Sequence, residues 1–426
     1  MSLSSEFFYR DNALVCERVD VASLARVYGT PCYVYAKRGI TSRYQAYKHA
    51  FAGSWSEVCY AVKANSNLTV LRTLVDEGAW FDIVSGGELF RVLAAGGDPA
   101  KVVFSGVGKT PDEIRFAIEK GIHRFNCESE AEIKLISGIA RAAGREVSIA
   151  VRVNPDVDAS THPYISTGLR EHKFGIDIAL AEAVYARAAM LPGVVSDGVS
   201  CHIGSQLLDV EPLLEAAGKM CSLVQRLRGR GLPIEFLDLG GGLGVPYGAN
   251  DHPAAIPAYI ERLRRVVEPL DLTIMLEPGR SIVAEAGILL TTVLLVKENG
   301  NKRFVIVDAA MNDLIRPALY QAYHEIVPVL REPVGEHMVA DVVGPVCETG
   351  DFFARDRDLP SVAPGDVLAI CTAGAYGFAQ SSNYNSRPRA CELLIDASDV
   401  HLARRRETYK DLIRGENVTL VHESLR

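Results

Sequence analysis

Residues 58–67, Val-Cys-Tyr-Ala-Val-Lys-Ala-Asn-Ser-Asn, join a short apolar run to a polar segment. A short apolar run that ends in this way is typical of a buried strand in a parallel sheet. Seven more runs of this kind follow along the chain, each separated from the next by a longer segment. The eight predicted strands span residues 58–63, 81–84, 102–105, 123–126, 147–153, 198–202, 236–239 and 273–276.

The segments between these strands have the periodicity of helices. Apolar residues recur every three or four positions in residues 68–77, 129–143 and 210–228, for example. Strands that alternate with helices form a parallel sheet, and eight such units close into a TIM (β/α)8 barrel. We therefore predict an α/β fold in which the barrel spans residues 38–286.

A second, β-rich domain is predicted after the barrel. From residue 281 onward helical periodicity largely disappears, and strand-like runs alternate with Gly, Pro and Asp turns. These runs cover residues 288–297, 304–307, 341–343, 367–371 and 391–395. The strand-like residues 31–35 precede the barrel and are expected to pair with the same sheet. The second domain is thus predicted to combine residues 1–37 with residues 287–426.

The composition excludes several classes of function. The 426 residues are 48% hydrophobic and 23% charged, as in an ordinary soluble protein. The longest apolar stretches are too short to span a bilayer and the N-terminus has no signal-peptide pattern, so we expect a cytoplasmic protein without membrane contact. A net charge of −8 without a long basic run argues against nucleic acid. Nine cysteines without a Cys-x-x-Cys pair argue against a metal site, so the expected partner is a small molecule.

Lys63 stands where the first strand meets its loop, which is the catalytic end of a TIM barrel. Burial there would remove water from the ammonium group and lower its pKa, so that the amine could attack an aldehyde and form a Schiff base. A lysine that merely extends from a strand end into solvent is the alternative, and it would be preferred if Lys63 stood alone.

Other strands also end in residues that suit a phosphate-bearing cofactor. Three glycines at positions 240–242 follow the seventh strand, where backbone amides of this fold commonly converge on a phosphate, although they could also form a simple tight turn. Glu277 ends the eighth strand and could pair with a protonated pyridine nitrogen. His202 could stack on a flat ring or be an ordinary barrel histidine. Together with Lys63, these residues indicate pyridoxal phosphate.

The motifs at these strand ends resemble those of the fold type III, alanine-racemase-like pyridoxal-phosphate decarboxylases over nearly the whole chain. The motifs are Tyr60-Ala61-Val62-Lys63-Ala64-Asn65, His202-Ile203-Gly204-Ser205-Gln206, Gly240-Gly241-Gly242, Glu277-Pro278-Gly279-Arg280 and Cys347-Glu348-Thr349-Gly350-Asp351. Residues 172–175, 311–320 and 383–388 are similar to the diaminopimelate decarboxylases rather than to the ornithine or arginine enzymes.

The resemblance implies decarboxylation of meso-2,6-diaminopimelate to L-lysine and carbon dioxide, the last step of lysine biosynthesis. It implies that Lys63 carries pyridoxal 5'-phosphate as a Schiff base and that Cys347 is the catalytic acid. The implied cofactor-binding residues are Lys63, His202, Ser205, Gly241, Gly242, Glu277, Pro278, Gly279, Arg280 and Tyr376. The implied substrate-binding residues are Arg280, Arg316, Tyr320, Glu348 and Tyr376. Because family members are homodimers in which the Cys347 loop reaches the partner's barrel, the resemblance also implies shared active sites.

Arg280 and Arg316 supply a chemical reason for this substrate, because two arginines could bind the carboxylate at the far end of diaminopimelate. The alternative for Arg316 is a surface ion pair. Two rival functions stay open at this point. One is a decarboxylase of another amino acid, such as D-lysine or D-ornithine, and the other is a catalytically inactive, cofactor-binding regulator.

Overall fold

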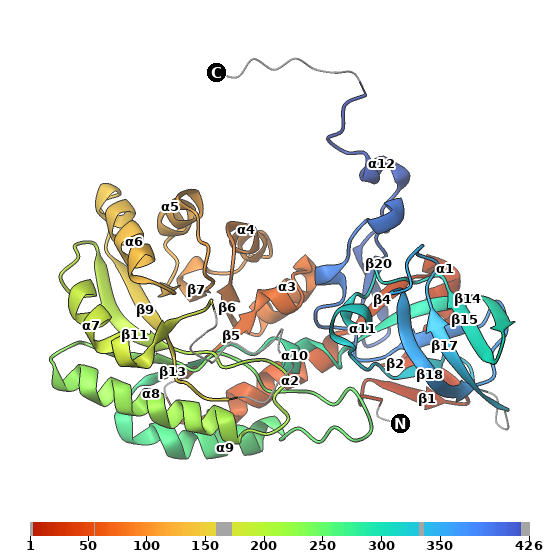
Figure 1. Ribbon diagram of the computed structural model, residues 1–426, viewed down its shortest axis with the longest axis horizontal. Coiled ribbons are helices and arrows are strands. Elements are labelled where there is room, and N and C mark those ends of the chain that lie inside the picture. Colours follow the sequence, from red (N-terminus) through yellow and green to blue (C-terminus); the bar gives the residue numbers. More distant parts are fainter. Residues whose placement is uncertain (1–2, 55, 159–172, 332–335, 419–426) are drawn as a thin grey trace.

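The computed structural model describes residues 3–54, 56–158, 173–331 and 336–418. Eight parallel strands close into a barrel beside a region rich in antiparallel strands (Figure 1). The barrel strands are β5 (Ser56–Ala61), β6 (Trp80–Ile83), β7 (Val102–Phe104), β8 (Arg124–Cys127), β9 (Val147–Asn154), β11 (Val194–Ser200), β12 (Phe236–Asp238) and β13 (Thr273–Leu276). The ladder closes through the pairs β13–β5 and β8–β9. The predicted TIM barrel is confirmed.

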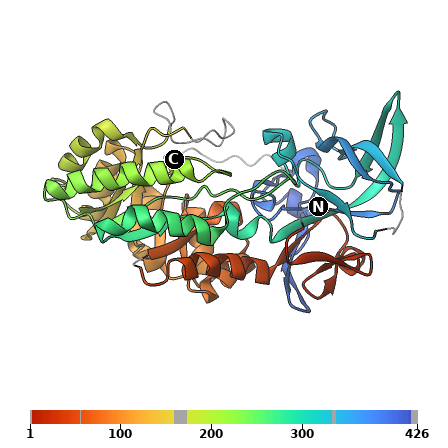
Figure 2. The same cartoon turned by 90° about the horizontal axis from the view of Figure 1, so that it is seen from below.

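Helices cover the outside of this barrel. They are α2 (Lys37–Ala50), α3 (Leu68–Asp76), α4 (Gly86–Ala94), α5 (Pro111–Lys120), α6 (Glu130–Ala142), α7 (Ile178–Ala188), α8 (Glu211–Gly229), α9 (Ile256–Val267) and the short α10 (Arg280–Val283). Helix α5 illustrates the local rules, because Thr110 and Glu113 form a capping box at its start and Gly121 ends it in the left-handed conformation. Seen from below, α8 and α9 lie along the barrel in front of its strands (Figure 2).

The stretch that carries Lys63 differs from its prediction in one respect. Strand β5 ends at Ala61, and Val62–Ala64 form a 3-10 turn at the C-terminal end of the barrel. The hydroxyl of Tyr60 donates to the carbonyl of Asn65 at 2.9 Å and so fixes this turn. Lys63 therefore lies on a turn beyond the ladder and not within the strand.

The β-rich region is a second sheet with the order β18-β17-β15-β14-β4-β20-β21, and β16 and β19 pair beside β14. Its elements are β4 (Cys32–Ala36), β14 (Gly287–Asn299), β15 (Lys302–Val307), β16 (Ile326–Pro328), β17 (His337–Val343), β18 (Phe352–Pro360), β19 (Val367–Ile370), β20 (Cys391–Asp396) and β21 (Asp399–Arg404), with the helices α11 (Arg316–Tyr320) and α12 (Tyr409–Leu412). As expected for residues 31–35, β4 joins this sheet, between β14 and β20. The exact division of the chain at residues 38 and 286 stays a prediction.

The remaining elements pack near the N-terminus. They are the small antiparallel sheet β1 (Phe7–Arg10), β2 (Ala13–Cys16) and β3 (Val19–Asp20) and the helix α1 (Val21–Tyr28). The two-residue strand β10 (Ile176–Asp177) lies elsewhere, beside the barrel strand β9. All nine cysteines are unbridged, and of these only Cys347 is exposed. Within the described ranges, no helix is long and apolar enough to cross a membrane.

Candidate active site

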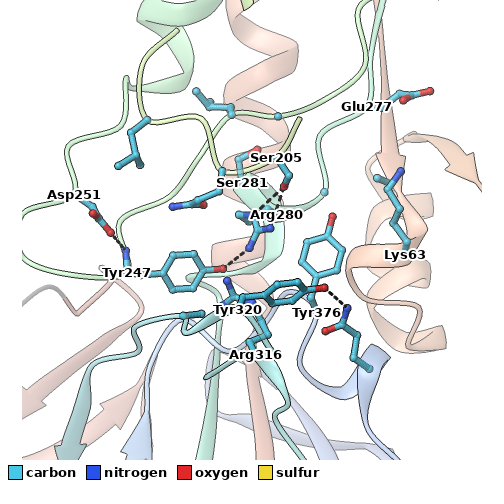
Figure 3. A pocket seen from close by; sticks show the side chains of 18 of the residues that line it. Lys63, Ser205, Tyr247, Asp251, Glu277, Arg280, Ser281, Arg316, Tyr320 and Tyr376 are labelled. Atoms are coloured by element: carbon cyan, nitrogen blue, oxygen red, sulfur yellow. Dashed lines mark hydrogen bonds between the residues drawn. The ribbon is translucent and has the colours of Figure 1, made fainter. Parts of the chain in front are cut away.

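A cavity of about 420 Å³ lies between the C-terminal ends of the barrel strands and the β-rich region. Lys63, Glu277 and Arg280 come from the barrel side, whereas Arg316 and Tyr376 come from the second region (Figure 3). Of the residues implied by the sequence, the cavity wall contains Lys63, His202, Ser205, Gly242, Glu277, Gly279, Arg280, Arg316, Tyr320 and Tyr376. Ten residues that are far apart in the sequence therefore meet at one site.

The environment of Lys63 corrects the predicted pKa. The amine forms an ion pair with Asp82 at 3.0 Å, and the Asp82 carboxylate is fully buried. Burial alone lowers the pKa of Lys63, but the negative charges of Asp82 and Glu277 outweigh burial and raise it above the ordinary value. The prediction of a lowered pKa was wrong because the sequence does not show how closely Asp82 and Glu277 approach the amine. Their charges favour the ammonium form of Lys63.

Acidic groups dominate the floor of the cavity beside Lys63. Asn126 donates to Asp238 at 2.9 Å and to Glu277 at 3.2 Å, and both carboxyl groups are buried. Burial and the nearby charges of Asp238 and Asp82 raise the pKa of Glu277 well above its usual range. Lys63 therefore faces Asp82 and Glu277, and the repulsion among the buried carboxyl groups favours the protonated form of Glu277.

The glycine loop corrects a second expectation. The amide of Gly240 donates to Asp238 at 2.9 Å, and the amide of Gly241 donates to Nδ1 of His202 at 3.2 Å. Only the Gly242 amide has no hydrogen-bond partner among the described residues. The three amides therefore do not converge on one anion, because the barrel's own side chains use two of them. Gly242, with a φ of 124°, still adopts a backbone conformation that favours glycine.

Gly241 and Pro278 lie behind the cavity wall. A Cβ on Gly241 would stand 2.3 Å from the carbonyl oxygen of Glu277, so a side chain at this position would collide with the backbone. This glycine is required by the contact between the loop and the end of β13, whichever ligand binds. A direct cofactor contact of Gly241 or Pro278 stays a prediction.

His202 is a neutral side chain in the cavity wall. Its Nδ1 accepts the hydrogen bond from Gly241, which fixes the tautomer. Burial and the positive charges of Arg152 and Lys63 lower the pKa of His202 well below its usual value. A neutral imidazole at this position can lie against a flat ring without adding charge.

Arg280 and Arg316 are both buried, with exposed fractions of 7% and 5%. Arg280 donates to the hydroxyl of Tyr247 at 2.8 Å and to Ser205 at 3.0 Å. Arg316 donates to His324 at 2.8 Å and lies over the ring of Tyr247, with 4.3 Å from the guanidinium carbon to the ring centre. Among the described residues, neither guanidinium has a carboxylate partner. The surface ion pair considered for Arg316 is thereby excluded.

Cys347 and Glu348 lie outside the cavity wall. Both are exposed, and the amide of Cys347 donates to the side chain of Asn385 at 3.1 Å. Glu348 interacts with the hydroxyl of Tyr384. The structure of one chain therefore does not bring them to Lys63. His172, in one of the motifs that suggested the substrate, is outside the described residues.

Several functional side chains were missed in the sequence. Asp82 and Asp238 interrupt otherwise apolar strands, and a carboxylate inside such a strand is a signal of a buried partner. Tyr247, which follows the glycine loop, was likewise not assigned a role. Tyr376, by contrast, was implied by the resemblance, and it has a φ of 56°, a conformation that is uncommon for tyrosine. His324 carried no distinctive signal.

The cavity fits pyridoxal phosphate. The amine of Lys63 is accessible, with 38% of its side chain exposed, beside the proton-bearing Glu277. The atoms Asp82 Oδ1 and Asn126 Oδ1 are buried without a hydrogen-bond partner among the described residues, which leaves polar positions for a bound group. Ser205, Arg280 and the Gly242 amide form a cationic, donor-rich edge that suits a phosphate. The donor set thus matches the aldehyde, ring and phosphate of the cofactor.

Comparison with known proteins agrees with this geometry. Residues 37–284 match the family model of the pyridoxal-dependent decarboxylase, pyridoxal binding domain. The chain is 55% identical to diaminopimelate decarboxylase of Pseudomonas aeruginosa, over 97% of this chain and 99% of that protein. The chain belongs to the diaminopimelate decarboxylase family.

Solved structures of the family have the same fold. Diaminopimelate decarboxylase from M. jannaschii, in complex with L-lysine, is similar with a TM-score of 0.93 and 39% identity, over 97% of this chain and 98% of that one. The enzyme from Helicobacter pylori, also in complex with L-lysine, has a TM-score of 0.89 and 44% identity, over 93% and 98% of the two chains. Membership of this family makes the chain a pyridoxal-phosphate-dependent decarboxylase.

We expect Asp82→Asn to lower the pKa of Lys63 by about one pH unit or more, because burial would then be opposed by less negative charge. The pKa can be measured by NMR on cofactor-free protein with ¹³C-methylated lysines, with Lys63→Ala to assign the signal. Asp341→Asn, which removes the partner of the exposed Lys302, is the matched control and should leave Lys63 unchanged. An unaltered Lys63 pKa in Asp82→Asn would contradict the electrostatic assignment.

Proposed function

We propose that this chain decarboxylates meso-2,6-diaminopimelate to L-lysine and carbon dioxide, the last step of lysine biosynthesis, in the cytoplasm and as a homodimer. The observation that carries the substrate assignment is the pair of buried guanidinium groups, Arg280 and Arg316, which have no acidic partner in the part of the chain that the structure describes. The names of the relatives and the L-lysine in two solved family members agree with it.

The cavity keeps the two arginines apart from Lys63 and Glu277. Lys63 and Glu277 lie on one side in Figure 3, whereas Tyr247 and Asp251 lie on the other, with the arginines between them. Bound pyridoxal phosphate supplies an electron sink for the pair of electrons left behind when carbon dioxide departs. Glu277 holds a proton at its carboxyl group close to Lys63, and His202 offers a neutral face. Ser205 and Arg280 are placed to bind an anionic group.

The distal end of the substrate explains the arginines. A buried guanidinium without a counter-charge is costly, and a ligand carboxylate removes that cost through charge-assisted hydrogen bonds. Diaminopimelate has a second carboxylate at the end that is not decarboxylated. D-lysine and D-ornithine have no carboxylate at that end. With either of these substrates, Arg316 would stay buried and unneutralised, which disfavours the rival decarboxylases.

In a carbon dioxide release assay, we expect the holoenzyme to prefer meso-diaminopimelate and to form one L-lysine for each carbon dioxide. D-lysine and D-ornithine should be at least about tenfold poorer in kcat/KM, because a charged hydrogen-bond partner is lost. Lys63→Ala is the inactive control. Preference for D-lysine or D-ornithine would support the rival decarboxylase, and no turnover of any substrate would support the regulator.

The position of Cys347 supports shared active sites. Unlike the other eight cysteines, Cys347 is exposed, and its loop does not enter the cavity of its own chain. A thiol can deliver a proton only if it reaches the reacting atoms. In a two-fold dimer an exposed loop of one subunit can complete the site of the other. We therefore assign Cys347 and Glu348 to the partner's cavity as part of this proposal.

Mixing two inactive variants tests this arrangement. Lys63→Ala and Cys347→Ala should recover about a quarter of wild-type activity after random subunit exchange, because half of the dimers are mixed and each mixed dimer has one complete site. Activity should be measured together with heterodimer formation by native mass spectrometry. Verified heterodimers without activity would show that the sites are not shared in this way.

A further inference from the structure

His324 lies between α11 and β16 and is completely buried. Its Nε2 is 2.8 Å from Nη1 of Arg316, and its Nδ1 is 2.8 Å from the carbonyl oxygen of Cys371. A guanidinium group can only donate, so Nε2 is the acceptor and Nδ1 carries the hydrogen that the carbonyl accepts. The two neighbours thus fix one neutral tautomer.

The surroundings of His324 hold it rigidly. The side chain of Arg357 donates to the carbonyl of His324 at 2.9 Å, which anchors the backbone. The imidazole packs edge-on against Tyr247, with ring centres 5.2 Å apart, and Arg316 lies over the same tyrosine ring. Burial and the positive charge of Arg316 lower the pKa of His324 well below its usual value, with further contributions from Arg280 and Arg357. The imidazole is therefore neutral.

A neutral acceptor and a carboxylate would have different effects on Arg316. Either one can orient the guanidinium group through a hydrogen bond. A carboxylate would also neutralise the positive charge and compete with any anionic ligand in the cavity. Because the bond to His324 uses only one of the five N–H groups of arginine, the charge and the remaining donors stay available.

We propose that His324 is a positioning residue for substrate specificity, which orients Arg316 toward the cavity while preserving its charge for the distal carboxylate of the substrate. This assignment rests on the proposed function. It extends the substrate site to a residue that does not line the cavity. It also explains why a buried arginine is paired with a histidine and not with an acid.

Three substitutions separate orientation, charge and structure. His324→Gln keeps an acceptor for Arg316, and His324→Glu has nearly the shape of the Gln variant but adds a negative charge. His324→Asn keeps a donor for the Cys371 carbonyl but does not reach Arg316. For meso-diaminopimelate, we expect KM to stay within about threefold in His324→Gln and to rise by about tenfold or more in both His324→Glu and His324→Asn, with smaller changes in kcat. The exposed His337, changed to Gln, is the control.

The affinity for L-lysine provides a second readout. In calorimetric titrations of the holoenzyme, the affinity for L-lysine should stay close to that of the wild type in His324→Gln and fall in both His324→Glu and His324→Asn. The affinity for cadaverine, which lacks a carboxylate, should not differ in this way among the variants. Equal KM and L-lysine affinity for His324→Gln and His324→Glu would overturn the role of charge. His324 would have a purely structural role if His324→Gln lost more L-lysine affinity than His324→Asn. The same conclusion would follow if the variants lost cadaverine affinity in parallel with L-lysine affinity. A wild-type enzyme inactive on meso-diaminopimelate would instead refute the proposed function, and this inference with it.

Discussion

Burial of two guanidinium groups, for which residues 3–54, 56–158, 173–331 and 336–418 supply no acidic partner, is the constraint on which the active site depends. Arg280 begins the short helix after β13, whereas Arg316 begins α11 in the β-rich region. Neither half of the molecule alone could enclose both groups and bring them to the same cavity. The packing of the second region against the barrel therefore forms the cavity, and in our proposal the cost of burying these charges is recovered when the substrate carboxylate binds.

At the end of the cavity near Lys63, acidic groups are in excess. Asp82 and Glu277 face Lys63, and the raised pKa values of Asp238 and Glu277 favour a proton on this buried pair, because full ionisation would place too much negative charge in a dry space. The site is thus polarised, with a proton reservoir beside the amine and a cationic surface toward the second region. A substrate with an amino-acid group at each end is complementary to this arrangement.

The sequence was sufficient for the barrel, because eight apolar runs with helical segments between them allow few other architectures. The local pattern also brought Lys63 to the C-terminal end of the first strand, although the residue lies on the turn after β5 and not in the strand. It did not predict the pKa of Lys63, which depends on pairing β5 with β6 so that Asp82 comes opposite Ala61. Likewise, the hydrogen bond from the Gly241 amide to His202 depends on a contact between strands that are distant in sequence.

Other features depend on contacts between the two halves of the chain. Tyr247 lies in a loop of the barrel, yet its ring packs against Arg316 and His324 of the second region. No local pattern indicates such a contact, because each residue has an ordinary sequence environment. The position of Cys347 depends on a second subunit in our proposal, so it is beyond the reach of any argument from a single chain.

The most direct test of this account is the affinity of the holoenzyme for L-lysine and for cadaverine, measured by calorimetry in the wild type and in Arg316→Met. These ligands differ in the carboxylate that Arg316 is expected to bind. We predict that the substitution weakens L-lysine binding by at least about tenfold and leaves cadaverine binding nearly unchanged. Equal weakening of both ligands, or no change in L-lysine affinity, would contradict the claim that the buried arginine recognises the distal carboxylate.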